Sequence, residues 1–148
     1  MRYPFDPKFI TGRFGTLSEF RKARGMQPHS GVDWARPEGT PIPSIANGTI
    51  VLQQWSDVLG NVSVLRVMGA DKKLYYVGFC HLAKPGLEVG TKVKEGDTIG
   101  LIGGGKKFPS GSASSGGHLH LTVSREVKGV FGPTSVKQDP IEFIKANK

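Results

Sequence analysis

The segment His118–Ser124 reads His-Leu-His-Leu-Thr-Val-Ser, and its pattern decides the fold class. Side chains of a β-strand point alternately to its two faces. The two leucines and the valine therefore point together into a core, whereas His118 and His120 share the opposite, exposed face. The alternation predicts a strand that presents two imidazoles side by side, where they are well placed to share a metal ion.

Further strands are predicted by short segments rich in Val, Ile and aromatic residues, separated by turn signals such as Leu59-Gly60-Asn61. These segments are Thr49–Trp55, Val62–Met68, Leu74–Phe79 and Thr98–Ile102. Helices are few. Ser18–Arg24 is long enough for one or two turns, and Asp139-Pro140 reads as the cap and first residue of a short closing helix. Because no helices are available as parallel crossovers, the predicted class is mainly β with an antiparallel sheet.

The length of 148 residues suits one domain with its own core, so residues 1–148 are predicted to form a single domain. No apolar run approaches the ~18 residues of a membrane-spanning helix, which predicts no membrane insertion. Met1–Ile10 is interrupted by Pro4, Asp6 and Pro7 and lacks the apolar core of a secretory signal. The sequence thus predicts a protein made in the cytoplasm without its own signal peptide.

The formal net charge of +8 favours anionic partners: nucleic acid, anionic membranes or the acidic polymers of a cell wall. The basic residues are dispersed, except in Arg21–Arg24 and the pair Lys106-Lys107. There is no basic helix and no basic segment interleaved with aromatic residues. Charge alone therefore does not distinguish a binding surface from a solubilising one.

A second pair of candidate metal ligands lies in the segment His29-Ser30-Gly31-Val32-Asp33. Pro28 and Gly31 disfavour a helix, and an extended segment also places His29 and Asp33 on one side. Alone, this pattern fits an ordinary surface turn better. Together with the His-x-His of the strand it can supply a set of three ligands of the kind that zinc prefers. Three protein ligands leave a fourth position on zinc for water, as in catalytic sites.

The single cysteine, Cys80, excludes an internal disulfide and a multi-cysteine zinc site. A cysteine hydrolase that uses Cys80 with His81 is disfavoured, because adjacent residues of a strand point to opposite faces. Two loops stand out by composition, Gly103–Gly105 and the Gly/Ser-rich Ser110–Gly117. The second loop leads directly into His118, and its composition fits either a flexible connector or a loop with a binding role.

With these residues assembled, the chain resembles the lysostaphin-type (LytM-like) zinc metalloendopeptidases of bacteria and their phages, from Ile10 to about Ile144. Six segments carry the resemblance: Ile10–Gly15 with its Phe-Gly, the His-x-Gly-x-Asp motif His29–Asp33, Gly39–Gly48, Cys80-His81-Leu82, Val93–Gly100, and Gly117-His118-Leu119-His120. In three respects the chain departs from the family pattern. Phe79 stands where a tyrosine is usual, Gly117 replaces the small or proline residue often found before the closing histidine pair, and the segment Gly103–Gly117 is longer than in many relatives.

The resemblance implies one zinc ion bound by His29, Asp33 and His120, with His81 and His118 in catalytic roles. One imidazole would take a proton from water and the other would donate to the developing oxyanion. The implied fold is an antiparallel β-sheet core of the lysostaphin/LytM type, duplicated-hybrid-like, with a loop-walled groove and few short helices.

The implied function is hydrolysis of peptide cross-links in bacterial peptidoglycan, which makes the protein a bacteriolytic metalloprotease. We expect a monomer that binds peptidoglycan and no nucleic acid. The chain looks like a phage endolysin, which reaches the wall through a holin pore, or a tail-associated hydrolase that reaches it from outside.

Other functions remain open on the sequence. One is a zinc amidase that cleaves the sugar–peptide amide of the same polymer. Another is a non-catalytic relative that binds the wall or regulates other hydrolases. The turns in Thr40–Val51 and Val93–Ile102 also resemble biotinyl/lipoyl carrier domains, although no lysine occupies a Met-Lys-Met-type tip. A nucleic-acid binder rests on charge alone.

Overall fold

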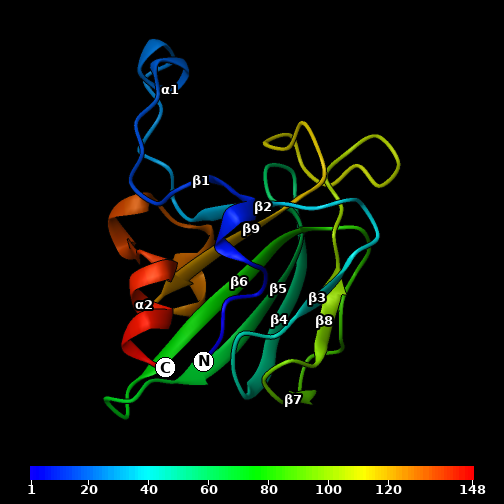
Figure 1. Ribbon diagram of the computed structural model, residues 1–148, viewed down its shortest axis with the longest axis vertical. Helices are drawn as coiled ribbons and strands as arrows, with labels where there is room; N and C mark the ends of the chain where they lie inside the picture. Colours follow the sequence, from blue (N-terminus) through cyan, green and yellow to red (C-terminus); the bar gives the residue numbers. More distant parts are fainter.

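The computed structural model describes all residues 1–148 and shows a chain folded mainly into antiparallel β-sheet (Figure 1). The strands are β1 (Ile10–Gly12), β2 (Val32–Ala35), β3 (Pro41–Pro43), β4 (Gly48–Ser56), β5 (Gly60–Met68), β6 (Leu74–Leu82), β7 (Lys92–Val93), β8 (Thr98–Leu101), β9 (His118–Ser124) and β10 (Lys137–Gln138). The helical elements are α1 (Glu19–Ala23), α2 (Pro140–Ala146) and the 3-10 turns η1 (Pro7–Phe9), η2 (Val127–Phe131) and η3 (Thr134–Val136).

The main sheet has eight strands in the order β1-β2-β9-β6-β5-β4-β7, with β10 paired to β9. All of its pairings are antiparallel. Every strand predicted from the sequence is present, but Thr98–Leu101 (β8) pairs with β3 in a separate two-stranded sheet. The predicted mainly β class with few short helices is confirmed.

Both predicted helices form, and their caps explain where they begin. The Ser18 hydroxyl accepts a hydrogen bond from the Arg21 amide at 3.3 Å, and the Asp139 carboxylate accepts one from the Ile141 amide at 2.9 Å. Each cap satisfies an amide that has no partner within its helix. Helix α1 belongs to an arm that projects from the body, whereas α2 packs on the body (Figure 1). None of the helices has the length and apolar character needed to cross a lipid bilayer.

Strand β9 lies between β2 and β6, and the side chains on one of its faces are part of the main hydrophobic core. Leu119, Leu121 and Val123 are fully buried in that core, as the alternating pattern predicts. The prediction that the opposite face is exposed is wrong: Thr122 and Ser124 are 0% and 3% exposed. The segment η2 packs there and buries this face of β9 as well.

The two buried hydroxyl groups on the second face of β9 both have hydrogen-bond partners. The Thr122 hydroxyl donates to the carbonyl of Ser30, and the Ser124 hydroxyl donates to the carbonyl of Val136, both at 3.0 Å. Because each buried hydroxyl is paired, neither residue carries the cost of an unsatisfied polar group. The contact from Thr122 also ties β9 to the chain just before β2.

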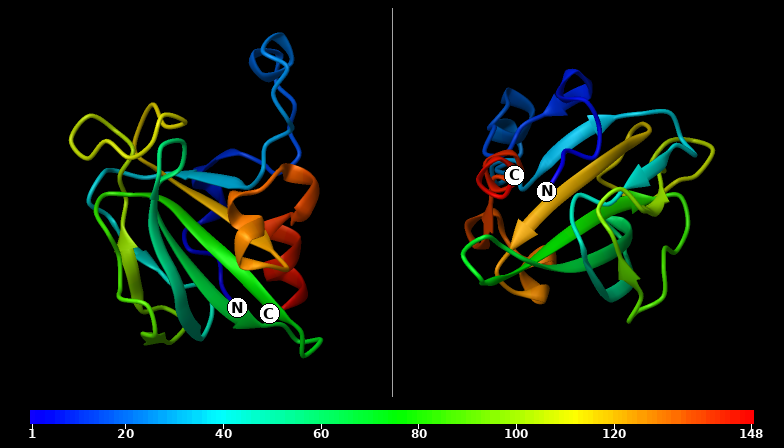
Figure 2. Two further views of the ribbon diagram at one scale, coloured as in Figure 1. Left: turned by 180° about the vertical axis from the view of Figure 1, so that it is seen from behind. Right: turned by 60° about the horizontal axis from the view of Figure 1, so that its bottom comes forward.

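Two segments rise from the end of the molecule opposite the chain termini (Figure 2). One is the arm around α1, and the other is the long connection between β8 and β9. The paired strands β2 and β9 pass between these two segments, and the candidate ligands lie on this pair or just before it.

Candidate metal centre and active site

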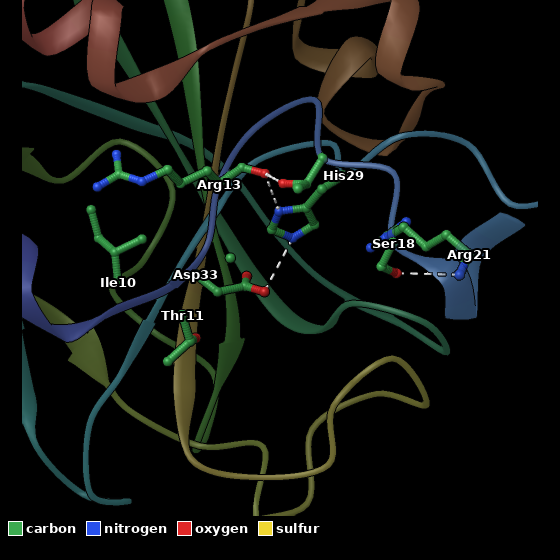
Figure 3. Close-up of a pocket in the computed structure, with 9 residues that line it drawn as sticks. Ile10, Thr11, Arg13, Ser18, Arg21, His29 and Asp33 are labelled. Carbon is green, nitrogen blue, oxygen red and sulfur yellow. Dashed lines mark hydrogen bonds and ion pairs between the residues drawn. The ribbon is translucent and has the colours of Figure 1, made fainter.

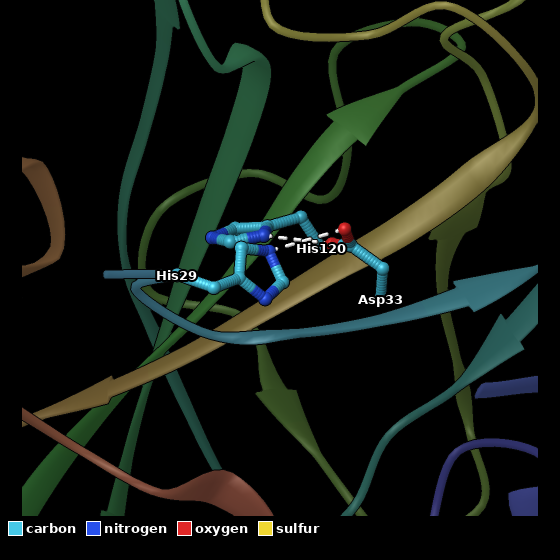
Figure 4. A group of neighbouring side chains, drawn as sticks. All are labelled: His29, Asp33 and His120. Atoms are coloured by element: carbon cyan, nitrogen blue, oxygen red, sulfur yellow. Dashed lines mark hydrogen bonds and ion pairs between the residues drawn. The ribbon is translucent and has the colours of Figure 1, made fainter. Parts of the chain in front are cut away.

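Three candidate ligands from two adjacent strands meet at one point (Figure 4). Asp33 in β2 stands directly opposite His120 in β9, and His29 lies just before β2. An Asp33 carboxylate oxygen is 2.8 Å from Nδ1 of His120, and the other is 3.1 Å from Nε2 of His29. One potential ligand atom from each residue lies within 4.8 Å of the other two. The structure thus brings together the three residues predicted to bind the metal.

Glycine at position 31 is what allows the two strands to approach so closely. A Cβ atom there would clash with the backbone carbonyl of Leu121 and would lie 2.9 Å from Nε2 of His120. Contacts this short do not occur between real side chains and neighbouring atoms. The Gly in the sequence His29-Ser-Gly-Val-Asp33 is therefore required by the packing of His120.

Hydrogen bonds determine which nitrogen of each ligand histidine is free. Nδ1 of His29 lies 3.1 Å from the carbonyl oxygen of Arg13, which can only accept, so Nδ1 donates and Nε2 keeps its lone pair. Nε2 of His120 lies 3.4 Å from the hydroxyl of Ser30, whereas its Nδ1 faces Asp33. Metal-binding histidines generally use the second nitrogen in such a hydrogen bond, which holds the ring in place.

The charges of the group suit a cation. Burial raises the pKa of Asp33, but the imidazoles of His120 and His29 next to its carboxylate outweigh this effect, so the pKa falls below its usual range. Burial lowers the pKa of His120 despite the nearby carboxylate. Neutral imidazole and ionised carboxylate are the forms that bind metal. Two imidazoles and one carboxylate are a donor set that fits zinc, and the prediction of one zinc ion agrees with it.

The two histidines predicted to be catalytic lie beside this group. His118 is at the start of β9, with Nε2 3.8 Å from a carboxylate oxygen of Asp33. The ring centroids of His81 and His118 are 4.7 Å apart, and those of His81 and His120 are 6.2 Å apart. The chain therefore gathers all four of its histidines around Asp33.

His81 is held in an unusual way. It is the second-to-last residue of strand β6 and has a left-handed backbone (φ 59°), a conformation that histidine tolerates better than most residues. Its Nδ1 lies 2.5 Å from the carbonyl oxygen of Ser110, so Nδ1 donates and Nε2 is free. Burial lowers the pKa of His81 to about 4, so the imidazole is neutral near pH 7.

Cys80 takes no part in the site. Its side chain is fully buried in a small separate cluster with Val62, Val64 and Val130. Burial raises the pKa of the Cys80 thiol to about 12, so the thiolate needed for nucleophilic attack does not form near neutral pH. The structure thus excludes the cysteine hydrolase.

The low pKa of His81 predicts a pH dependence of stability. Between pH 6.5 and about 4 the unfolded chain binds a proton at His81 that the folded chain does not. Stability should therefore decrease as the pH falls through this range, and the contribution of His81 to this decrease should level off below about pH 4. Thermal unfolding of chelator-treated protein should show a smaller decrease for His81→Asn than for wild type. Parallel curves for the two proteins would contradict this assignment.

A pocket of about 440 Å³ adjoins the ligand group on the side of the α1 arm (Figure 3). His29 and Asp33 line it together with Arg13 and Arg21. Arg21 donates a hydrogen bond to the carbonyl of Gln27, whereas the guanidinium of Arg13 has no hydrogen-bond or ion-pair partner. The pocket thus offers positive charge next to the candidate metal centre.

Several contacts of the site were not predicted from the sequence. The carbonyl groups of Arg13, Ser110 and Gly116 each accept a hydrogen bond from a site histidine. Because every residue has a backbone carbonyl, no residue pattern marks these acceptors. The only signal in the sequence is the Gly/Ser-rich segment Ser110–Gly117 directly before His118, and it fits a flexible connector equally well.

Comparison with known proteins gives the class of the chain. Peptidoglycan DD-endopeptidase ShyA of Vibrio cholerae is 29% identical over 147 residues, which cover 99% of this chain and 29% of ShyA. Lysostaphin of Staphylococcus simulans is 31% identical over 141 residues, 88% of this chain and 26% of lysostaphin. The chain spans less than a third of the length of these relatives.

A solved structure of a zinc-containing peptidase from Vibrio cholerae superposes with a TM-score of 0.70 at 28% identity, covering 93% of this chain and 38% of that one. Fold and candidate ligand group together indicate the class of a metallopeptidase domain, with a donor set that fits zinc. The sequence profile of Peptidase family M23 matches residues 27–133, and the chain belongs to this family. The predicted lysostaphin-type fold is thereby confirmed.

Proposed function

We propose that the chain is a zinc endopeptidase that hydrolyses the peptide cross-links of bacterial peptidoglycan, with residues 1–148 forming one peptidase domain. The observation that carries the proposal is the gathering of His29, Asp33 and His120 within 4.8 Å of one another, with His81 and His118 beside them. ShyA, which is named a peptidoglycan DD-endopeptidase, supports the choice of substrate.

In this proposal His29, Asp33 and His120 would hold the metal, and a bound zinc ion would supply Lewis-acid polarisation of the scissile carbonyl and a more acidic water. His81 and His118 each donate through Nδ1 to a backbone carbonyl, so both present a free Nε2 to the site. Either Nε2 can accept the proton of the attacking water. The imidazole that has gained it can then donate to the amine nitrogen of the leaving peptide. No carboxylate takes part in the proton transfer, because Asp33 is assigned to the metal.

Digestion of isolated cell walls tests the proposal against the zinc amidase. Mass spectrometry of the products should show opened cross-links, and a chelator should abolish their formation. Release of whole peptide stems from intact glycan would identify an amidase instead. A zinc-loaded protein that binds walls and releases no fragments would be a non-catalytic relative.

The substrate pocket is suited to an anionic peptide. Arg13 lines the pocket together with His29 and Asp33, and stem peptides of peptidoglycan carry carboxylates. Such an exposed charge pair contributes ~0.2–1 kcal/mol and is screened by salt.

Arg13→Gln should therefore raise KM by about 2–5-fold at low salt, with kcat unchanged, because binding of an anionic stem is weakened equally before and during the reaction. The difference from wild type should shrink as salt increases. Lys94→Gln is the matched control, since Lys94 is exposed just after β7, at the other end of the molecule. A soluble stem peptide with its carboxylates amidated should not distinguish Arg13→Gln from wild type. Equal effects of the two variants would show that only the net charge matters.

The proposed place of action is the cell wall, and the proposed working form is a monomer. Light scattering of the zinc-loaded protein, alone and with soluble wall fragments, measures the mass of that form directly. A stable dimer under working conditions would require revision of this point.

A further inference from the structure

The two histidines proposed to move protons are oriented by a single loop, Ser110–Gly117. Its first residue supplies the carbonyl 2.5 Å from Nδ1 of His81. Its last turn supplies the carbonyl of Gly116, 2.9 Å from Nδ1 of His118. A neutral imidazole carries its proton on either nitrogen, and the partner of one nitrogen decides which form is present. The loop thus decides the form of both rings.

The start of the loop is anchored to the turn between β4 and β5. Ser110 is 1% exposed, and its hydroxyl accepts a hydrogen bond from the Asn61 amide at 3.0 Å. The amides of Ser112 and Ala113 donate to the carbonyls of Asp57 and Val58. The carbonyl opposite His81 is therefore fixed by the neighbouring strand pair.

The end of the loop depends on one side chain, that of Ser114. Its hydroxyl oxygen lies 2.7 Å from the carbonyl of Gly104, 3.0 Å from that of Gly116 and 3.2 Å from Nδ1 of His118. The hydroxyl has one hydrogen to donate and lone pairs to accept. With its hydrogen on the Gly104 carbonyl, the nearest acceptor, it accepts from the Nδ1–H of His118, which it shares with the Gly116 carbonyl.

We propose that Ser114 is a positioning residue that ties the two ends of the Gly104–His118 connection together, and so keeps the Gly116 carbonyl where it holds the proton of His118 on Nδ1. The proposal rests on the catalytic role of His118 given above. Its neighbour Ser115 is exposed and makes no side-chain hydrogen bond, so the role belongs to one of two adjacent serines. The consequence is that Nε2 of His118 keeps its lone pair and its direction toward Asp33.

The test compares Ser114→Ala with Ser115→Ala in the zinc-loaded protein. Mutation of the hydrogen-bond partner of a histidine in a metal site typically lowers metal affinity or activity about 10–100-fold. We therefore expect kcat of Ser114→Ala to fall by about 10-fold or more, with KM and zinc content unchanged. Ser115→Ala should match wild type. Ser114→Thr, which keeps the hydroxyl, should recover most of the rate. Equal kcat values for the two alanine variants would overturn the proposal, as would a loss of rate that only follows a loss of zinc or of folded protein.

Nitrogen-15 spectra of the histidine rings separate this proposal from the proposed reaction, because they need no substrate. In wild type the His118 signals should show the proton on Nδ1, and in Ser114→Ala they should move toward a mixture of the two neutral forms. Unchanged His118 signals in Ser114→Ala would overturn the positioning role even if the enzyme cuts peptidoglycan. A shift without any wall cleavage would support the positioning role and reject the proposed reaction.

Discussion

Replacement of His120 by alanine is expected to remove both the zinc ion and the activity. His120 is one of only three candidate ligands, and its Nδ1 faces Asp33 directly across the β2–β9 pair. Metal binding provides several kcal/mol of transition-state stabilisation in enzymes of this kind, which corresponds to a rate factor of ~10³ or more. Atomic emission should find almost no zinc in His120→Ala, and wall lysis should fall to the background rate.

The matched control for this variant is Thr122→Val. Thr122 lies two residues further along the same face of β9 and is equally buried, but it does not contact the ligand group. If zinc loss were caused by a damaged strand, Thr122→Val would lose zinc as well. Circular dichroism and thermal unfolding of both variants show whether the sheet is intact. Full activity in metal-free His120→Ala protein would refute the proposed mechanism.

The second large effect is expected from His81→Asn and His118→Asn, which should keep zinc and lose turnover. General acid–base groups contribute ~10²–10⁴-fold to rate, so each variant should be slower by about that factor. Asparagine suits position 81 because it tolerates the left-handed backbone there and its amide can donate to the Ser110 carbonyl. Zinc content and single-turnover cleavage of a soluble cross-linked peptide measure the two properties separately.

The double variant shows whether the two histidines act as a unit. Residues that share one proton transfer show effects that are far from additive. His81→Asn with His118→Asn should then be little slower than the slower single variant. Loss of zinc from His81→Asn would instead make His81 a ligand, and wild-type turnover in either single variant would remove that histidine from the mechanism.

The sequence pattern predicts the centre of this fold well because β9 is governed by one local rule. The alternation of Leu119, Leu121 and Val123 with the two histidines predicts correctly both the buried face and the side shared by His118 and His120. The motif His29–Asp33 likewise brings its two candidate ligands together, with Asp33 in β2 and one glycine, Gly31, that the packing requires. For these residues, local geometry and tertiary structure agree.

What the sequence does not reveal depends on packing between distant segments. The second face of β9 is buried only because η2 returns to cover it, and nothing in the sequence around Thr122 indicates that segment. Likewise, β8 has the pattern of a sheet strand but pairs only with β3. The roles of Ser110 and Ser114 arise from contacts with Asn61 and Gly104 and with the site histidines, which no local pattern encodes.

Cys80 has a practical consequence for experiments on this molecule. Its sulfur is sealed in the interior and stays protonated, so maleimide and iodoacetamide reagents should leave the native protein unlabelled. A cysteine introduced on the exposed tip of the α1 arm, for example Phe20→Cys, would then be the sole reactive thiol. A fluorophore or spin label attached there would test whether the arm moves when a wall fragment enters the neighbouring pocket.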